Sequence, residues 1–207
     1  MNRYVDIYLN VYWLTNSRQN YLDEEVLKPY LKSITDKGIN KEKIYFMPNW
    51  AEDIFESNKL EEVSKEKLNI PEGFIIMFAG NIGEAQDFEA ITEAIELTKN
   101  DVNIKWVFVG DGRKITWFQD QIKQRNLENN VSLLGRFPTE SMPLFFRYAD
   151  VMLVTLKDEH IFSLTVPGKV QSYMAANKPI LTMLNGAGSA IVEEAKCGLI
   201  ANAGDYS

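Results

Sequence analysis

Three continuous apolar runs, each followed by a turn of small or polar residues, constrain the fold most strongly. The runs I-K-W-V-F-V, V-S-L-L and V-M-L-V-T-L begin at Ile104, Val131 and Val151. Strands that are buried on both faces are rich in Val, Ile and Leu without alternation, and helical patterns between such strands are typical of a parallel sheet. We therefore predict an α/β fold in which helices flank a parallel sheet.

Strand and helix patterns alternate from Pro71 to the end of the chain. Strands are expected at 74–79, 104–109, 131–134, 151–156, 179–183 and 197–201. Helices are expected at 87–99, 114–126, 139–148, 168–176 and 189–195. The spacing of Phe88, Ile91, Ile95 and Leu97 predicts that these side chains lie in the core. Because the carboxyl ends of parallel strands share one edge of the sheet, the turns after these strands are the expected place for a ligand.

The first 70 residues follow another pattern. Val5 to Leu14 fits a strand or a short helix, and helical spacing over 17–38 predicts a helix that ends at Gly38. A brief strand is expected at 43–47, closed by a turn at Pro48-Asn49-Trp50. Residues 48–70 are acidic and weakly patterned, which indicates a linker with room for one short helix.

The bulk composition excludes several classes of function. The 207 residues carry a formal net charge of −7, with one histidine and one cysteine, Cys197. The charge opposes broad binding to a nucleic-acid backbone, and a single His and Cys exclude an internal disulfide and a conventional zinc site. No apolar run reaches the roughly 20 residues of a membrane span, and no signal peptide is visible at the N-terminus. We expect a cytoplasmic protein without a bound metal or nucleic acid.

Two glycine turns follow expected strands. The first holds Gly80, Asn81 and Gly83, and the second is Gly110-Asp111-Gly112. Glycines let the backbone approach a ligand closely, and the start of the helix after the first turn would attract a phosphate. The first turn lacks the G-x-G-x-x-G spacing of a dinucleotide site, and both turns also fit simple chain reversals.

Two further strand-end loops carry cations. Arg136 and Phe137 follow Gly135 and suit a flat base, although a surface arginine beside a packed ring fits equally well. Lys169 lies in the first turn of an expected helix, where a cation is mildly disfavoured and therefore indicates an anionic partner; a solvated lysine is the alternative. His160 lies beside acidic residues and is expected to be a solvated loop residue.

The order and spacing of these strings resemble the C-terminal half of a GT-B glycosyltransferase of the retaining family 4, of the type found in bacterial capsule and O-antigen assembly. The matching strings over residues 74–205 include F-A-G-N-I-G, F-V-G-D-G-R-K, V-S-L-L-G-R-F and P-G-K-V-Q-S-Y-M-A-A-N-K-P-I-L. The resemblance implies a Rossmann-like domain at 71–207 that binds the nucleotide-sugar donor and is cut short at its end. Residues 1–47 would be a remnant of the N-terminal acceptor domain, and 48–70 would connect the two.

The resemblance also implies roles for the loop residues. A nucleotide-sugar, most simply UDP-linked, would be the substrate and no cofactor would be needed. Its base would lie near Arg136 and Phe137, and its diphosphate near the first glycine turn and Lys169, which would stabilise the leaving group. The acceptor would be lipid-linked or a glycan, the full enzyme would work peripherally at the inner membrane face, and this chain alone would be inactive.

The sequence departs from the family pattern at two points. Leu164 and Ser172 stand where the family has a pair of glutamates, and no cation lies between Asn81 and Asp87. The resemblance then implies that Lys169 would neutralise more of the diphosphate charge. Backbone amides of Thr165 and Val166 would replace a glutamate contact to the sugar, and Ser172 would form a hydrogen bond with the ribose.

Two other functions fit the residues. One is a nucleotide-sugar epimerase of related fold, for which no catalytic acids can be located. The other is a non-catalytic protein-interaction domain, with Tyr12, Trp13 and Trp50 exposed where the missing lobe would pack.

Overall fold

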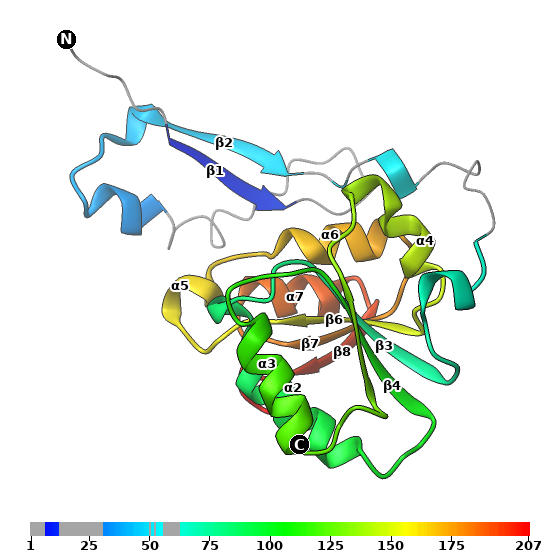
Figure 1. Cartoon of the computed structure of the whole chain (residues 1–207). Coiled ribbons are helices and arrows are strands. Elements are labelled where there is room, and N and C mark those ends of the chain that lie inside the picture. The colour runs from blue at the N-terminus through cyan, green and yellow to red at the C-terminus, as the bar shows by residue number, and fades with distance from the viewer. Residues whose placement is uncertain (1–6, 13–30, 50, 52, 56–62) are drawn as a thin grey trace.

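The computed structural model describes residues 7–12, 31–49, 51, 53–55 and 63–207. These residues form two sheets, which lie apart in Figure 1. The smaller sheet pairs β1 (Ile7–Tyr12) with β2 (Ile44–Asn49) in parallel. The larger sheet contains six strands: β3 (Phe74–Ala79), β4 (Ile104–Val109), β5 (Val131–Gly135), β6 (Val151–Thr155), β7 (Ile180–Met183) and β8 (Gly198–Ala201).

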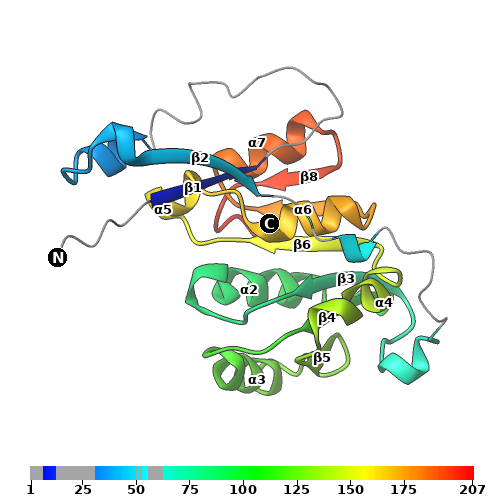
Figure 2. The ribbon, with the colours of Figure 1, turned by 90° about the horizontal axis from the view of Figure 1, so that it is seen from above.

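The larger sheet is parallel throughout, with the strand order β5-β4-β3-β6-β7-β8. Figure 2 shows β5 and β8 at its two ends. The chain first moves outward from β3 to β5 and then returns to the other side of β3, so the order reverses between β3 and β6. Ligands of such sheets bind outside the strand ends at the point of reversal. The predicted Rossmann-like α/β fold is confirmed.

Helices cover both faces of the sheet (Figure 1). They are α2 (Phe88–Thr98), α3 (Ile115–Gln124), α4 (Met142–Phe146), α5 (His160–Ser163), α6 (Gly168–Ala175) and α7 (Ala187–Glu194). Short 3-10 turns lie at Lys41–Lys43, Asp53–Phe55, Glu66–Leu68, Glu84–Gln86 and Thr139–Ser141.

Alternate residues of β3 face two separate cores, as a strand buried on both sides requires. Ile75 and Met77 pack with side chains of α4, α6 and α7, whereas Ile76 and Phe78 pack with side chains of α2 and α3. The core prediction for α2 holds for Phe88, Ile91 and Ile95 and is wrong for Leu97, which is 61% exposed. Leu97 lies nine residues after Phe88, or about two and a half turns, so its side chain is on the opposite side of α2.

The N-terminal segment differs in part from the prediction. The range from Val5 to Leu14 was predicted to be either a strand or a short helix, and it contains the strand β1. The turn predicted at Pro48-Asn49 is wrong, because both residues continue β2 and Pro48 lies opposite Val11. Among the described residues β2 pairs with β1 alone, and the unpaired edge of a strand tolerates a residue without an N–H group.

Other features near the N-terminus bear on the predicted helix and linker. Residues 31–35 are helical, and Gly38, with φ of +84°, follows that helix as expected. The rest of the helix predicted at 17–38, together with Trp13 and Trp50, lies outside the described residues. Within the predicted linker, the 3-10 turns at Asp53–Phe55 and Glu66–Leu68 are the helical elements that the structure describes. The sequence also missed α5, a helix of four residues.

Candidate functional site

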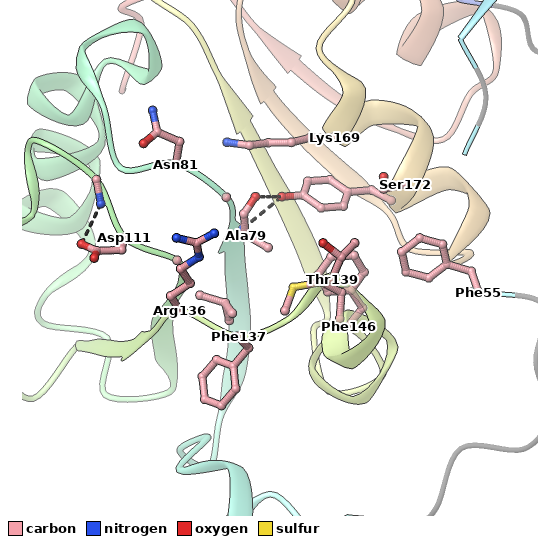
Figure 3. A pocket seen from close by; sticks show the side chains of 16 residues that line it. Phe55, Ala79, Asn81, Asp111, Arg136, Phe137, Thr139, Phe146, Lys169 and Ser172 are labelled. Atoms are coloured by element: carbon pink, nitrogen blue, oxygen red, sulfur yellow. Dashed lines mark hydrogen bonds between the residues drawn. The ribbon is translucent and has the colours of Figure 1, made fainter. Parts of the chain in front are cut away.

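A cavity of about 610 Å³ lies at the carboxyl edge of the larger sheet (Figure 3). Most of the residues predicted for a ligand site line it, namely Gly80, Asn81, Gly110, Asp111, Gly112, Arg136, Phe137, Lys169 and Ser172. They come from the loops after β3, β4 and β5 and from the first turns of α6. The structure therefore brings together residues that are up to 92 positions apart in the chain, from Gly80 to Ser172.

The two glycine turns form one wall and continue the hydrogen-bond ladder beyond the strands. The Gly80 N–H donates to Val109 O at 2.8 Å, and the Ile82 N–H donates to Asp111 O at 2.9 Å. Gly110 adopts φ of +144°, and a Cβ atom there would lie 1.9 Å from Gly80 O. The backbones approach so closely that only glycine fits at Gly110.

Lys169 points from α6 toward Asn81 (Figure 3). Its Nζ is shielded from solvent and has no hydrogen-bond partner among the described residues. The Nζ lies 3.5 Å from the centroid of the Phe78 ring, whose negative face attracts a cation. A Cβ atom on Gly80 would lie 2.6 Å from Lys169 Cε, so the bare glycine makes room for this side chain.

Desolvation dominates the electrostatics of Lys169. Burial disfavours the charged form and lowers the pKa of Lys169 from 10.5 to about 7. The carboxylate that lines the same cavity, Asp111, accepts a hydrogen bond from the Gly112 N–H at 2.7 Å. The site therefore holds a cation whose charge is not balanced by an ion pair within the described residues.

Lys114, whose N–H donates to Ile82 O at 3.0 Å, is a buried lysine whose charge is balanced by carboxylates. Its Nζ contacts Glu89 Oε1 and lies 3.4 Å from Glu84 Oε2. Glu84 also pairs with Lys157 at 3.0 Å, and this bond followed by the contact with Lys114 holds the pKa of Glu84 below its ordinary value. Lys114 does not line the cavity; it ties the start of α3 to α2.

Arg136 and Phe137, which directly follow β5, line another side of the cavity. Phe137 packs on Phe145 with ring centroids 4.5 Å apart and remains 38% exposed. Arg136 is exposed and makes no hydrogen bond or ion pair with the rest of the described chain, so its guanidinium is available to a ligand. The pair presents one cation and one partly exposed ring to the cavity.

Three predicted residues do not line the cavity: Gly83, Thr165 and Val166. The Val166 side chain is buried in the core. The Thr165 N–H donates to Phe162 O at 3.0 Å and its hydroxyl donates to Ile161 O at 2.8 Å, so both donors are already engaged. The Ser172 hydroxyl lines the cavity while donating to Gly168 O at 3.3 Å. Their proposed contacts to the sugar and ribose stay predictions.

Part of the cavity wall is aromatic and was not predicted from the sequence. Phe55 and Phe146 line it and stack with centroids 5.5 Å apart and an interplanar angle of 11°. Tyr173 lines it from α6 and is fully buried. Tyr173 lies in the string that carried the family resemblance, whereas Phe55 sits in a weakly patterned segment without any signal.

Two further kinds of feature, a metal site and a membrane-spanning helix, were sought among the described residues. They contain no group of three or more His, Cys, Asp or Glu side chains that could hold a metal ion. Within the same residues no helix is long and apolar enough to cross a membrane. His160 is exposed at the start of α5.

Comparison with known proteins identifies the family. A family model for "Glycosyl transferases group 1" matches residues 61–207. The chain is 33% identical over 173 residues to "Probable glycosyltransferase WbjE" of Pseudomonas aeruginosa, covering 79% of this chain and 41% of that protein. It is 27% identical over 139 residues to WcaI of Escherichia coli K12, whose name assigns it provisionally to colanic acid biosynthesis, covering 64% of this chain and 33% of WcaI.

The fold is also found in a solved structure of low sequence identity. HepE of Anabaena, solved in complex with UDP and glucose, superposes with a TM-score of 0.68 at 17% identity, over 86% of this chain and 48% of HepE. The chain thus spans less than half the length of these relatives. Since the family model covers most of the chain and a relative at one-third identity supports it, this protein belongs to the group 1 family of glycosyltransferases.

Proposed function

We propose that this chain is the donor-binding part of a glycosyltransferase that uses a nucleotide-sugar. The observation that carries the proposal is Lys169, a shielded ammonium without an ion-pair partner among the described residues, at the edge of a cavity. A buried cation is costly unless an anion accompanies it. A diphosphate bound between Lys169 and the Gly80 turn would provide that anion.

The surroundings of Lys169 suit a phosphate group in two further ways. The first turn of α6 contributes the partial positive charge of a helix N-terminus. The Gly80 and Gly110 turns present bare backbone, which a phosphate can approach without meeting a side chain. We therefore assign the diphosphate to the end of the cavity that these elements form.

The base belongs at the other end of the cavity, beside Arg136 and Phe137. A guanidinium and a partly exposed ring offer hydrogen bonds and stacking to a flat heterocycle. A UDP-linked donor is the simplest choice, since HepE, which shares the fold, binds UDP and glucose. We assign the ribose to Ser172, which lines the cavity from the same helix as Lys169.

The reaction that we propose is retaining transfer of a sugar in the assembly of a bacterial surface polysaccharide, such as a capsule or O-antigen. As the bond from the sugar to the diphosphate breaks, negative charge grows on the leaving oxygen, and a preorganised cation in a dry cleft stabilises it. Lys169 is the residue placed for this task, and the diphosphate itself would accept the proton of the acceptor hydroxyl.

The whole enzyme requires more than this chain. We assign residues 1–47 to an acceptor domain, 48–70 to the connection and 71–207 to the donor domain. The acceptor, lipid-linked or a glycan, would bind between the two domains at the cytoplasmic face of the membrane. Alone, the chain would bind donor but transfer little, because the facing wall of the cleft is needed to position the acceptor.

The test is a calorimetric titration of this chain with UDP, GDP and CDP, repeated with Lys169→Met. We expect saturable binding of one diphosphate, weakened about 100-fold in the variant, because a charge-assisted bond to phosphate is lost. Lys105→Met is the matched control, since Lys105 Nζ bonds Asn129 O at the opposite end of β4. A folded wild-type chain that binds none of the three, or equal affinity in Lys169→Met, would refute the proposal.

A further inference from the structure

The central strands part at the edge of the sheet that carries the cavity. β3 and β6 are paired at Ile76 with Val151 and at Met77 with Met152, and the pairing ends there. Two residues further along β3, Ala79 still has an N–H and a C=O directed to that side. Buried backbone groups of this kind need a hydrogen-bond partner.

The Tyr173 hydroxyl is that partner. It accepts from the Ala79 N–H at 3.0 Å and donates to Ala79 O at 3.1 Å, the two dashed lines at Ala79 in Figure 3. The Tyr173 side chain is 1% exposed. A single hydroxyl from α6 therefore takes the place of the missing strand partner.

The bond joins the two elements that form the proposed diphosphate site. Tyr173 follows Lys169 by four residues on α6, so both side chains lie on one face of the helix. Ala79 immediately precedes Gly80, whose missing side chain leaves room for Lys169 Cε. Any slip of α6 along the end of β3 would therefore change the position of the Lys169 ammonium relative to the Gly80 turn.

We propose that Tyr173 is a positioning residue of the donor site, which fixes the Lys169 ammonium against the Gly80 turn through its two bonds to Ala79. The inference rests on the proposed function, since it assumes that a diphosphate binds at this place. The positioning role belongs to the hydroxyl, because it makes both bonds to Ala79. The ring makes a separate packing contact with Phe146, at 5.3 Å between centroids.

The matched variant is Tyr173→Phe, which keeps the ring and removes the hydroxyl. Tyr148→Phe is its control, since the Tyr148 hydroxyl bonds Val63 O at 2.5 Å and does not line the cavity. Thermal melting of both variants checks that they fold. Because the ring packing is retained, we expect both to melt cooperatively.

The first readout needs no ligand. Carbon-13 NMR of labelled lysine follows the titration of Lys169, assigned with Lys169→Met. The other ionisable groups that line the cavity are Asp111, Arg136 and Tyr173 itself. In the wild type we expect a midpoint near the pKa of about 7 that burial imposes. In Tyr173→Phe the ammonium gains access to water, and the midpoint should rise by about one unit; an unchanged midpoint overturns the inference.

The second readout separates positioning from general loosening. In Tyr173→Phe we expect UDP to bind about tenfold more weakly and uridine to bind unchanged, because only the diphosphate end is displaced. In the Lys169→Met background the same substitution should change UDP affinity less than twofold, since residues that act through one another are not additive. Equal losses for UDP and uridine, or an equal loss in both backgrounds, overturn the inference.

The two readouts distinguish the inference from the proposed function. A wild-type chain that binds none of UDP, GDP and CDP, with a shifted Lys169 midpoint in Tyr173→Phe, refutes the donor site and retains the control of Lys169 by Tyr173. A wild-type chain that binds UDP, with Tyr173→Phe equal to it in both readouts, refutes the role of Tyr173 alone.

Discussion

Two lysines with shielded ammonium groups stand at the starts of two helices, and their surroundings are opposite. Lys114 begins α3 between Glu84 and Glu89, whereas Lys169 begins α6 with no ion-pair partner among the described residues. Both lie over an aromatic ring, at 4.5 Å for Lys114 over Trp117 and 3.5 Å for Lys169 over Phe78. The ring contact therefore does not distinguish them, and the carboxylates do. Lys114 is neutralised by carboxylates and stabilises the fold. Lys169 is not neutralised by the described residues, lies beside a cavity and is therefore available to a ligand.

The most direct attempt to break this comparison exchanges each lysine for methionine. Lys169→Met should weaken UDP binding about 100-fold and leave the melting temperature equal or higher, because a buried unpaired charge is removed. Lys114→Met should change UDP affinity by less than about threefold and lower the melting temperature by about 3 °C, because two carboxylates lose their partner. Calorimetry and thermal melting measure both, and similar behaviour of the two variants would end the distinction.

A smaller change tests whether the position of Lys169 matters as well as its charge. Gly80→Ala places a Cβ atom 2.6 Å from Lys169 Cε, so we expect the lysine to move and UDP affinity to fall about 30-fold. Gly80 also has φ of +138°, which strains alanine. The control is Gly204→Ala, where φ is +78° and no atom lies within 4 Å of the added Cβ. Equal UDP affinity in Gly80→Ala and the wild type would contradict the assignment.

The dependence on pH separates the lysines further. The free site holds Lys169 with a pKa of about 7, and a bound diphosphate favours the charged form and raises that pKa. Binding then takes up a proton above pH 7, and UDP affinity should fall roughly tenfold per unit between about pH 7.5 and 9, where the phosphate is fully ionised. Titrations in buffers of different ionisation enthalpy count the proton, and a flat profile would argue against Lys169 as the phosphate ligand.

The free energy of unfolding of the free protein should rise with pH at both sites, but in two different pH windows. Because burial lowers the pKa of Lys169, the folded chain binds fewer protons than the unfolded chain between pH 7 and 10.5, and the free energy of unfolding should rise with pH over that window. Glu84 has a lowered pKa, so its contribution is present above the ordinary value of 4.5 and is lost as the pH falls through its folded value. Urea unfolding at several pH values checks both windows, and in Lys169→Met only the rise between pH 7 and 10.5 should be absent.

The smallest effect is expected at the base end of the cavity. Arg136→Ala should weaken UDP and uridine equally, by about fivefold, because an exposed guanidinium contributes less than a buried one. Arg113→Ala is the control, since Arg113 is exposed and does not line the cavity. A loss confined to UDP would move Arg136 to the phosphates and leave Phe137 alone at the base.

Local patterns in the sequence were enough to predict the sheet and the edge where the site lies. The uninterrupted apolar runs predicted the strands of the larger sheet, and the position of Lys169 in a first helical turn marked it as unusual before its surroundings were known. The pairing of Lys114 could not be predicted, because Glu84 and Glu89 meet it only after α2 and α3 pack together. Phe55 was missed for a similar reason, since its partner Phe146 lies 91 residues away.

Sequence patterns fail where tertiary context overrides a local signal. Pro48 and Asn49 form a common turn pair, yet they extend β2 because β1 supplies a partner and the free edge tolerates proline. Leu97 is a different case, because it lies about two and a half turns after Phe88 and so faces away from the core side of α2. The Tyr173 hydroxyl gives no signal in the sequence, because its value depends on where β3 and β6 separate.

The interlocked glycine turns also bear on the entropy of binding. The Gly80 and Gly110 amides donate across the end of the sheet at 2.8 Å, so the wall of the cavity opens only when the sheet itself opens. Its amides should exchange with deuterium as slowly as those of β3 and β4, unlike the amides of an ordinary surface loop. A ligand that binds there orders little additional chain, and little conformational entropy is lost on binding.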